Sequence, residues 1–471
     1  MSGDEPLENR PFAEIEIGDV ASISRTLTAE DIAVFAAVSG DINPTHFDEA
    51  FVHNGGKAGV VGHSMWGGGL ISNVLGTRLP GPGTIYLAQE LRFHHTFAVG
   101  DRITATVTAK EKRPDGKTVL FDCLCENQNG ETVVTGTAEV IAPTEKVRIA
   151  HAELPDVAVR RHEHHKKLIE ASHEIEPVAT AVVHPCDVPS LRGAIEAAQE
   201  GIIAPLFVGP SHRLEAVAEA EGLDLSGFRL IDAKHSHDAA AKAVALVRGG
   251  EAELLMKGSL HTDELMHEVM RRDSGLRTER RISHCFILDV PTYPRPLIIT
   301  DAAVNIEPTL EDKVDIVQNA IDLARALWHA PPRVAILSAV ETVTPKIRST
   351  IEAAALCKMA QRGQITGGLL DGPLALDNAI SEEAARIKQI ESEVAGRSDI
   401  LVAPDLEAGN MLAKNLSFLA GAVAAGVVLG ARVPIILTSR ADSLETRIAS
   451  CAVAALFGRD QQAKAVEPAV A

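Results

Sequence analysis

Hydrophobic and polar residues alternate over long stretches in the first third of the chain. An alternation of period two is typical of half-buried β-strands, and it occurs in four runs, at residues 84–97, 102–113, 119–128 and 132–141. Turn sequences such as Asn129-Gly130 connect the runs and favour hairpins. A helix at 28–38 and an apolar, glycine-rich helix precede them. We therefore expect an α+β domain of antiparallel strands and helices over residues 1–142.

The pattern changes in the second part of the chain, residues 176–471. Short apolar segments, at 181–183, 204–208, 334–337 and 400–402, alternate with longer Ala-rich stretches of helical character. This rhythm predicts an α/β region with a parallel sheet covered by helices. The apolar run at 416–430 is predicted as a buried helix that leads into a strand at 433–438. Residues 143–175 lose the alternation and carry many charges, which predicts a linker and an entry helix.

The charge and the composition exclude several classes of function. The formal net charge is −19, which repels nucleic acids and anionic membrane surfaces. The N-terminus is acidic rather than a charged-then-apolar signal region, and no run reaches the roughly 18 apolar residues of a membrane span. We expect a cytoplasmic protein with no nucleic-acid and no membrane partner.

Sequence motifs for cofactors are missing as well. The 6 cysteines and the histidines between residues 162 and 173 do not have the spacing of a disulfide framework or a zinc site. Neither G-x-x-x-x-G-K-[ST] nor a G-x-G-x-x-G that opens a βαβ unit occurs. We therefore expect no metal, nucleotide or other cofactor.

A polar loop in the first region carries candidate chemistry. Asp41 and His46 lie five positions apart on a constrained turn, where they can share one water. Hydration of an enoyl thioester needs a base, an acid and hydrogen-bond donors for the enolate oxygen, and the helix opened by residues 62–69 offers free N–H groups. Alternatively, Asp41 forms an Asx-turn or a helix cap and His46 is a packed surface histidine. A serine-hydrolase elbow is rejected, because Trp66 replaces the last glycine of G-x-S-x-G.

The combination of motifs in this region resembles the MaoC-like, R-specific enoyl-CoA hydratase family over residues 10–142. The matching segments are Asp41-x-Asn43-Pro44-x-His46, Gly62-His63-Ser64-Met65 and Leu79-Pro80-Gly81. The resemblance implies a hot-dog fold that is usually dimeric, with Asp41 and His46 activating water. It also implies that backbone amides near Gly68 hold the thioester oxygen, and that His63 and Ser64 contact substrate. Ser64 stands where the family often has glycine, and Trp66 with three glycines follows in place of smaller aliphatics.

Polar clusters follow several predicted strands of the second region. They are Met256-Lys257-Gly258-Ser259, residues 300–305, residues 370–373, residues 404–410 and residues 438–442. The carboxyl ends of parallel strands are where α/β proteins bind ligands. Each cluster alone is also explained as a turn or a helix cap. Five such clusters together favour a common site.

The order and the amino-acid sequences of these clusters resemble those of the phosphate acetyltransferase and phosphate butyryltransferase family over residues 165–462. The strongest matches are Asp371-Gly372-Pro373-Leu374, Pro404-Asp405-x-Glu407-Ala408-Gly409-Asn410 and Ser439-Arg440. The resemblance implies transfer of an acyl group between CoA sulfur and phosphate, in a cleft between two α/β subdomains. It implies neither a metal nor a covalent enzyme intermediate.

This chemistry requires an anion clamp, a hydroxyl donor and a base. Arg440 offers a planar fork, Lys257 a point charge and Ser439 a hydroxyl. The acetyl-specific branch has an Asp six positions after the arginine, where this chain has Thr446, so that either Asp442 or Glu445 is the candidate base. Asp442 is alternatively a helix N-cap. The further predicted substrate-binding residues are Asp301, Asn305, Asp371 and Asn410.

The leading hypothesis is a bifunctional acyl-CoA enzyme. Its N-terminal domain hydrates short trans-2-enoyl-CoA, and its C-terminal domain transfers acetyl to butyryl groups between CoA and phosphate. The expected partners are acyl-CoA, CoA, inorganic phosphate or acyl phosphate, and further copies of the chain in a homo-oligomer built on dimers. A second hypothesis makes the N-terminal domain a non-catalytic CoA-binding or oligomerisation module. A third treats the C-terminal half as a cofactor-dependent dehydrogenase.

Overall fold

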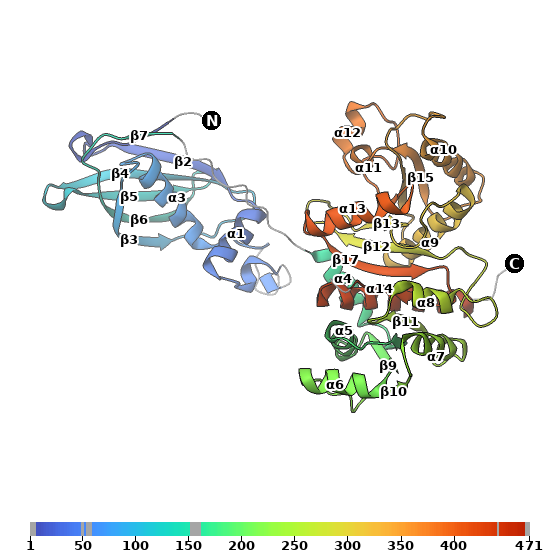
Figure 1. The fold of residues 1–471 in the computed structure, drawn as a ribbon. Coiled ribbons are helices and arrows are strands. Elements are labelled where there is room, and N and C mark those ends of the chain that lie inside the picture. Colours follow the sequence, from blue (N-terminus) through green and yellow to red (C-terminus); the bar gives the residue numbers. More distant parts are fainter. Residues whose placement is uncertain (1–5, 49–50, 53–58, 151–161, 440–441, 467–471) are drawn as a thin grey trace. The chain divides into compact units, whose positions relative to one another are not determined.

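The computed structural model describes residues 6–48, 51–52, 59–150, 162–439 and 442–466 (Figure 1). The chain divides into two compact units, residues 1–159 and 160–471. This division falls within the predicted linker of residues 143–175, of which 151–161 lie outside the described residues. Each unit has its own hydrophobic core and is considered by itself.

The N-terminal unit is a five-stranded antiparallel sheet with the long helix α3 against it (Figure 1). The strand order is β2-β4-β5-β6-β3. Its elements are β1 (Leu7–Glu8), β2 (Val20–Thr26), α1 (Ala29–Ser39), α3 (Ser64–Thr77), β3 (Ile85–Phe93), β4 (Arg102–Arg113), β5 (Thr118–Glu126), β6 (Thr132–Ile141) and β7 (Arg148–Ile149), with 3-10 helices at Phe12–Glu14, Pro44–His46 and Asp115–Lys117. The four alternating runs of the sequence correspond to β3, β4, β5 and β6.

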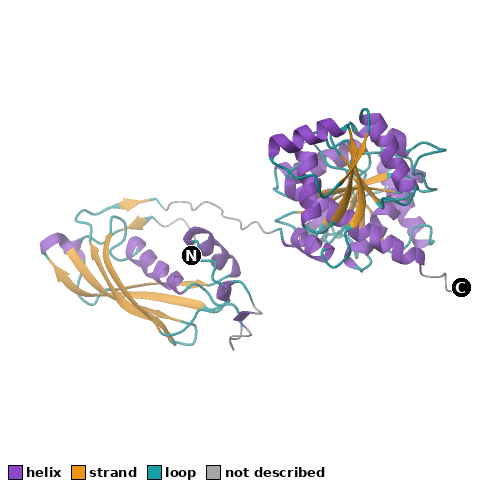
Figure 2. Cartoon of the chain, turned by 90° about the horizontal axis from the view of Figure 1, so that it is seen from below, coloured by secondary structure: helices purple, strands orange, loops and turns teal. Residues whose placement is uncertain are grey.

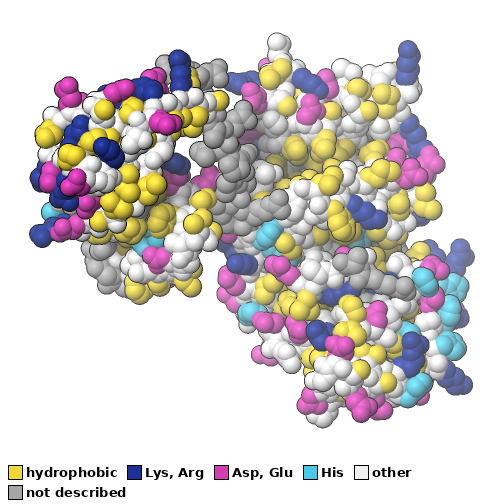
Figure 3. Space-filling model, turned by 60° about the vertical axis from the view of Figure 1, so that its left-hand side comes forward, with side chains coloured by type: hydrophobic (Ala, Val, Ile, Leu, Met, Phe, Trp, Pro, Cys, Tyr) yellow, Lys and Arg dark blue, Asp and Glu magenta, His cyan; other side chains and the backbone are white. Residues whose placement is uncertain are grey.

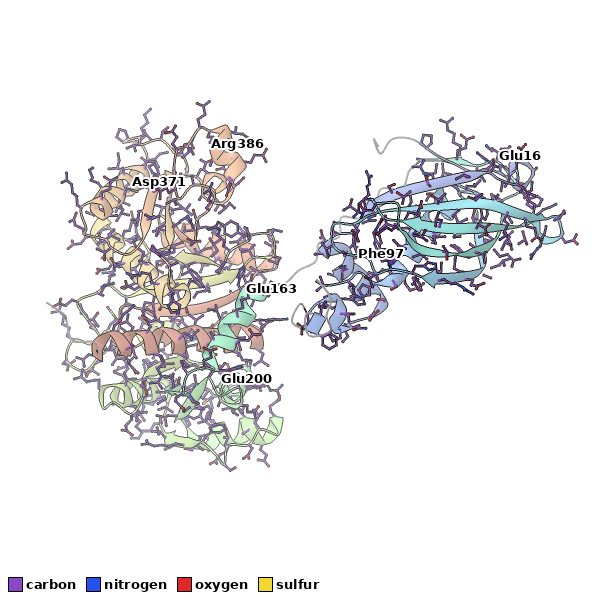
Figure 4. The ribbon with its side chains drawn as sticks, turned by 180° about the vertical axis from the view of Figure 1, so that it is seen from behind. Glu16, Phe97, Glu163, Glu200, Asp371 and Arg386 are labelled. Carbon is purple, nitrogen blue, oxygen red and sulfur yellow. The ribbon has the colours of Figure 1, made fainter. Side chains whose placement is uncertain are left out.

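On β4 and β5 the alternation follows from the burial of one face in the core, whereas β3 is exposed at every position except the half-buried Leu91. On β4, Ile103, Ala105 and Val107 point into the core with no exposed surface, while their neighbours are more exposed. Gly67 lets α3 approach the sheet, since a Cβ there would lie 3.2 Å from Cγ2 of Val134 on β6 and 2.7 Å from Cζ of Phe97. Phe97 is labelled in Figure 4 and packs edge-on against Trp66 at 5.8 Å between ring centroids.

The C-terminal unit has helices on both faces of a central sheet (Figure 2). Its helices are α4 (Glu163–Ser172), α5 (Val188–Gln199), α6 (Ser211–Glu221), α7 (Ser236–Arg248), α8 (Thr262–Val269), α9 (Leu310–Trp328), α10 (Arg348–Gln361), α11 (Leu376–Ile380), α12 (Glu382–Ile387), α13 (Leu406–Phe418) and α14 (Leu444–Val466). Its strands are β8 (Val178–Val183), β9 (Ile203–Gly209), β10 (Arg229–Asp232), β11 (Leu254–Lys257), β12 (Ser283–Asp289), β13 (Leu297–Thr300), β14 (Arg333–Leu337), β15 (Leu369–Leu374), β16 (Ile400–Val402), β17 (Val423–Leu429) and β18 (Ile435–Ile436).

The eleven strands have the order β10-β9-β8-β11-β18-β17-β12-β13-β16-β14-β15. Two parallel blocks flank an antiparallel centre: β10 to β18 form the first block and β13 to β15 the second. The pairings β18–β17, β17–β12 and β12–β13 are all antiparallel. The prediction of a parallel sheet is therefore wrong for its centre, and the two blocks run in opposite directions.

The predicted buried helix at 416–430 is also wrong. Helix α13 ends at Phe418, Gly421 adopts a left-handed φ of 69°, and β17 follows at Val423–Leu429. A short apolar run has no periodicity that separates a buried strand from a buried helix. Among the described residues, none of the helices combines the length and the apolarity that a membrane span requires.

The close pairing of β6 with β3 generates a stability prediction. A Cβ at Gly136 would overlap the carbonyl oxygen of Glu90 on the neighbouring strand. We expect Gly136→Ala to destabilise the N-terminal unit by about 1–3 kcal/mol, as overpacking usually does. Hydrogen exchange of the β3 and β6 peptides, measured in the intact chain across a urea series, reports the loss.

The matched control is Gly69→Ala on α3. A Cβ there meets nothing within 4 Å, and alanine is favoured over glycine in a helix by about 1 kcal/mol. If the amides of β3 and β6 are equally protected from exchange in Gly136→Ala and in Gly69→Ala, the prediction is contradicted.

Candidate functional site

The first candidate site lies on the loop after α1 in the N-terminal unit. Helix α1 ends at Gly40, whose φ of 74° turns the chain and whose N–H donates to the Ala36 carbonyl at 2.8 Å. The loop then enters the 3-10 helix at Pro44–His46, where the Asn43 side chain accepts from the Thr45 N–H at 3.2 Å. These two turns bring the side chains of Asp41 and His46 together.

A carboxylate and two imidazoles meet at this loop. Oδ2 of Asp41 lies 3.8 Å from Nε2 of His46 and 3.9 Å from Nε2 of His63. The two rings stack with centroids 3.8 Å apart and planes 28° apart. Both histidine side chains are buried, whereas half of the Asp41 side chain is exposed. The Asx-turn alternative also holds, because Oδ1 of Asp41 accepts from the Asn43 N–H at 3.2 Å, which leaves Oδ2 for the imidazoles.

Backbone carbonyls assign the proton positions on the two rings. Nδ1 of His46 lies 2.6 Å from the Val61 carbonyl oxygen, which only accepts, so Nδ1 donates and the neutral ring keeps a lone pair on Nε2. Nε2 of His63 lies 3.1 Å from the Asp41 carbonyl oxygen and donates to it. His46 therefore presents an acceptor next to Oδ2 of Asp41, while His63 fixes the backbone of the loop.

Helix α3 begins at Ser64, directly after the buried His63, with no side-chain cap at its N-terminus. The first N–H groups of a helix have no carbonyl partner four residues back. Here the Trp66 N–H donates to the His63 carbonyl at 2.9 Å, which leaves the N–H groups of Ser64 and Met65 as candidate donors near Gly68. A Cβ at Gly68 would lie 3.1 Å from Cδ1 of Leu91, so this glycine serves packing on β3.

Asp41, His46 and His63 are close enough to be considered as metal ligands, since one ligand atom of each lies within 4.8 Å of the others. The geometry fits a cation poorly. Stacked, nearly parallel rings direct their lone pairs side by side rather than toward one point, and Nε2 of His63 already donates to the Asp41 carbonyl. The arrangement fits a water held between Oδ2 of Asp41 and Nε2 of His46 better, at ~2.8 Å from each.

The second candidate site is a cavity of about 690 Å³ in the C-terminal unit. It lies over one face of β12 and β17, and it is lined from the ends of β11 and β18, from α13 and from the start of α14. Lys257, Asn410, Ser439 and Asp442 of the predicted site line it. Arg440 lies outside the described residues. Lys257 is 6% exposed, so a buried cation faces the cavity.

Ser439 and Asp442 form a tight turn at the cavity wall. The Ser439 N–H donates to Oδ2 of Asp442 at 2.6 Å, and the Asp442 N–H donates to the Ser439 carbonyl at 3.2 Å. Burial raises the pKa of Asp442, opposed by the bond from Ser439 and by the positive charges of Arg447 and Lys257. The N-cap alternative for Asp442 fails, because the Ser443 hydroxyl accepts from the Thr446 N–H at 3.2 Å and caps α14.

Four predicted site residues do not line the cavity among the residues that the structure describes. Asp301 accepts from the N–H groups of Ala303 and Val304 at 2.9 and 3.0 Å, and the Asn305 amide donates to the Ile282 carbonyl at 2.8 Å, so both shape the loop that carries Ala303. Glu445 is exposed on α14. Asp371 lies on β15, the last strand of the sheet order (Figure 4).

Arg447 is a site residue that the sequence interpretation missed. It is 2% exposed, and its guanidinium donates to the Thr438 hydroxyl at 3.0 Å and to the Ser439 carbonyl at 2.7 Å. Arg447 thus holds the strand end that carries Ser439. The sequence signal that could have revealed Arg447 is a single charged residue directly before an apolar helical run, residues 448–457.

His284 and Phe286 were missed as well. Both lie on β12 and line the cavity. Their sequence context, Ser283–Asp289, reads as an ordinary buried strand, so no local signal distinguishes them. Burial lowers the pKa of His284 to about 4, opposed by the charge of Asp301, so the ring is neutral near pH 7.

Comparisons with known proteins agree with this architecture. A family model described as "Phosphate acetyl/butaryl transferase" matches residues 234–455, and one described as "MaoC like domain" matches residues 14–123. A phosphate acetyltransferase of Rhizobium meliloti is 66% identical over 300 residues, which are 64% of this chain and 95% of that protein. The chain belongs to the phosphate acetyl/butyryl transferase family.

Two further relatives of this family extend the comparison. A phosphate butyryltransferase of Clostridium acetobutylicum is 41% identical over 285 residues, covering 60% of this chain and 94% of that protein. The crystal structure of a branched-chain phosphotransacylase from Enterococcus faecalis V583 is 30% identical with a TM-score of 0.54, covering 60% and 99% of the two chains. The predicted families and fold classes are confirmed: a hot-dog, MaoC-like N-terminal domain precedes an α/β phosphate acyltransferase region.

Proposed function

We propose that the C-terminal unit transfers short acyl groups between CoA and inorganic phosphate, and that the N-terminal unit hydrates short trans-2-enoyl-CoA. The single observation that carries the first activity is the cavity in which Lys257, Ser439 and Asp442 meet. Asp41 and His46 around one water position support the second. Both reactions use CoA thioesters, with phosphate or water as the co-substrate, and neither requires a cofactor.

In the transferase site the polar groups lie beside apolar ones. Lys257 offers a positive charge to phosphate and Ser439 a hydroxyl donor, while Asp442 accepts the CoA thiol proton when acyl phosphate is consumed. Phe286, Ala422 and Ala424 line the same cavity and offer an apolar surface to an acyl chain. This surface suits groups from acetyl to butyryl, in keeping with the acetyltransferase and butyryltransferase relatives.

In the hydratase site the water donates one hydrogen to Oδ2 of Asp41 and one to Nε2 of His46. The water oxygen then adds to C3 of the enoyl chain, one water proton passes to this pair, and the pair delivers a proton to C2. Free N–H groups at the start of α3 stabilise the negative charge on the thioester oxygen. The product is a 3-hydroxyacyl-CoA.

Substitution of Asp442 tests the transferase assignment. Asparagine still accepts the Ser439 N–H but cannot take a proton, so we expect Asp442→Asn to lower kcat by about 10²–10⁴-fold. Because burial raises the pKa of Asp442, wild-type activity should fall as the pH drops through that raised pKa, and the variant should lack this acid limb. Formation of butyryl-CoA from butyryl phosphate and CoA, the direction in which Asp442 acts as a base, measures both effects. Full activity in Asp442→Asn with loss in Glu445→Gln would instead make Glu445 the base.

Substitution of Asp41 tests the hydratase assignment. Asp41→Asn keeps the turn but removes the carboxylate, so we expect hydration of crotonyl-CoA to fall by about 10²–10⁴-fold, with transferase activity unchanged. The decrease in enoyl absorbance measures hydration. Asp122→Asn, a surface carboxylate of β5, is the matched control. An active Asp41→Asn would refute the role of Asp41, and an inactive wild-type chain would favour a non-catalytic N-terminal module.

We further propose a homo-oligomer built on dimers through β3. This strand is at the edge of its sheet and pairs only with β6. Its exposed side chains include Ile85, Leu87 and Phe93, at 59%, 53% and 44% exposure, and Figure 3 shows hydrophobic side chains gathered on the surface of this unit. A hydrophobic edge strand of this kind is a site of strand pairing.

A charge on β3 tests this assembly. We expect Leu87→Asp to reduce the particle mass to that of a smaller species, because an unpaired carboxylate would be buried at the contact. Size-exclusion chromatography with light scattering measures the mass. Ile17→Asp, at a residue 68% exposed that precedes β2 at the other edge of the sheet, is the control. An unchanged mass in Leu87→Asp would reject β3 as the contact.

A further inference from the structure

The cavity of the C-terminal unit contains a buried imidazole that the proposed mechanism leaves unused. His284 is 1% exposed and lines the cavity from β12. Its Nδ1 is buried and has no hydrogen-bond partner among the residues that the structure describes. Its backbone is fixed, since the Thr300 hydroxyl donates to the His284 carbonyl at 2.9 Å.

The packing around the ring holds the imidazole in one place. Phe286 contacts it edge-on, with centroids 4.4 Å apart and planes at 70°. On the neighbouring strand β17, Gly426 makes room for the ring, because a Cβ there would lie 3.2 Å from Nε2 of His284. Because Nδ1 is buried in this packing, it has lost the hydrogen bond that it would make to water. Such a group on a cavity wall is suited to a ligand that supplies the missing partner.

The charged groups near the ring define what it can do. Asp301 is the acid whose charge acts on His284. Its Oδ1 accepts from the N–H groups of Ala303 and Val304, and its Oδ2 accepts from the N–H of Asn305. Lys257 and Asp442 line the same cavity. His284 is neutral at working pH and keeps one ring N–H, so it is a hydrogen-bond donor without a net charge. A neutral, fixed donor suits an oxygen that becomes negative during the reaction.

We propose that His284 is a catalytic residue of the acyl transfer, donating a ring N–H to the carbonyl oxygen of the acyl thioester. This inference rests on the acyl transfer to phosphate proposed above. A phosphate oxygen attacks the thioester carbon, and the C=O electron pair moves onto the carbonyl oxygen, where the His284 N–H stabilises the charge. The pair returns as the C–S bond breaks, which releases acyl phosphate and CoA thiolate. His284 neither gains nor loses a proton.

Variants of His284 test this role in the intact chain, with butyryl-CoA and inorganic phosphate as substrates. We expect His284→Phe to lower kcat by about 10²–10³-fold, the usual loss for one oxyanion donor, with little change in KM for butyryl-CoA. His284→Asn and His284→Gln place an amide N–H near the positions of Nδ1 and Nε2. One of these two variants should have a kcat at least about tenfold above that of His284→Phe, which corresponds to roughly 1.4 kcal/mol in transition-state energy.

His165→Asn is the matched control, because His165 is also a buried histidine of this unit, at 2% exposure, but does not line the cavity. Melting curves of all variants separate loss of folding from loss of catalysis. The acid limb of the pH profile, measured with butyryl phosphate and CoA, should be the same in His284→Asn and wild type, since the ring moves no proton.

The outcomes are distinct. Recovery by one amide variant, with an unchanged acid limb, supports the role. The role is overturned if His284→Phe keeps a wild-type-like kcat, if the folded Phe, Asn and Gln variants all lose kcat equally, or if the acid limb is lost. In each of these cases the proposed acyl transfer itself still stands. A wild-type chain that releases no thiol from butyryl-CoA would overturn the acyl transfer, and the role of His284 with it.

Discussion

Three successive antiparallel pairings, β18 with β17, β17 with β12 and β12 with β13, reverse the chain direction in the middle of the large sheet. Because their number is odd, the two parallel blocks point in opposite directions, and their carboxyl ends do not share one edge. The cavity accordingly lies over the face of β12 and β17, where the carboxyl ends of β11 and β18 from only the first block also reach it. Side chains that alternate along β12, His284 and Phe286, therefore become part of the site.

The electrostatics of the cavity depend on burial more than on the charge of the chain. The chain carries a formal charge of −19. Among the described residues, however, the cavity that would receive anionic substrates is lined by Lys257 and Lys414 and by a single acid, Asp442. Behind the wall, Arg447 is almost fully buried, which costs several kcal/mol unless the guanidinium is hydrogen-bonded. Its bonds to Thr438 and Ser439 offset this cost and fix the strand end. The buried guanidinium of Arg447 therefore adds a positive charge behind the cavity wall and also positions Ser439.

The sequence allowed the prediction of whatever depends on local patterns. The strands β4 and β5 were predicted because one face of each is buried, so that burial and period two coincide, whereas β3 was predicted from its alternation although almost its whole length is exposed. Asp41 and His46 were found because the turns that join them lie within one short segment. The reversal of the sheet was not predictable, since strand direction depends on pairings between distant segments. For the same reason His284 and Arg447 were missed, and Asp371, which looked like a site residue, lies on the outermost strand β15.

His46 and His284 have opposite surroundings, and the difference follows from what each proposed reaction asks of the imidazole. In the N-terminal unit, the Val61 carbonyl fixes the proton on Nδ1 of His46, so that Nε2 can only accept, as activation of a water requires. In the C-terminal unit, His284 has no such partner on Nδ1, and the ring is held by Phe286 and by the space at Gly426. A thioester oxygen that gains negative charge needs a donor whose position is fixed before the reaction begins. Apolar packing provides that position without consuming the hydrogen bond, which explains why a buried imidazole is left unpaired on the wall of a cavity.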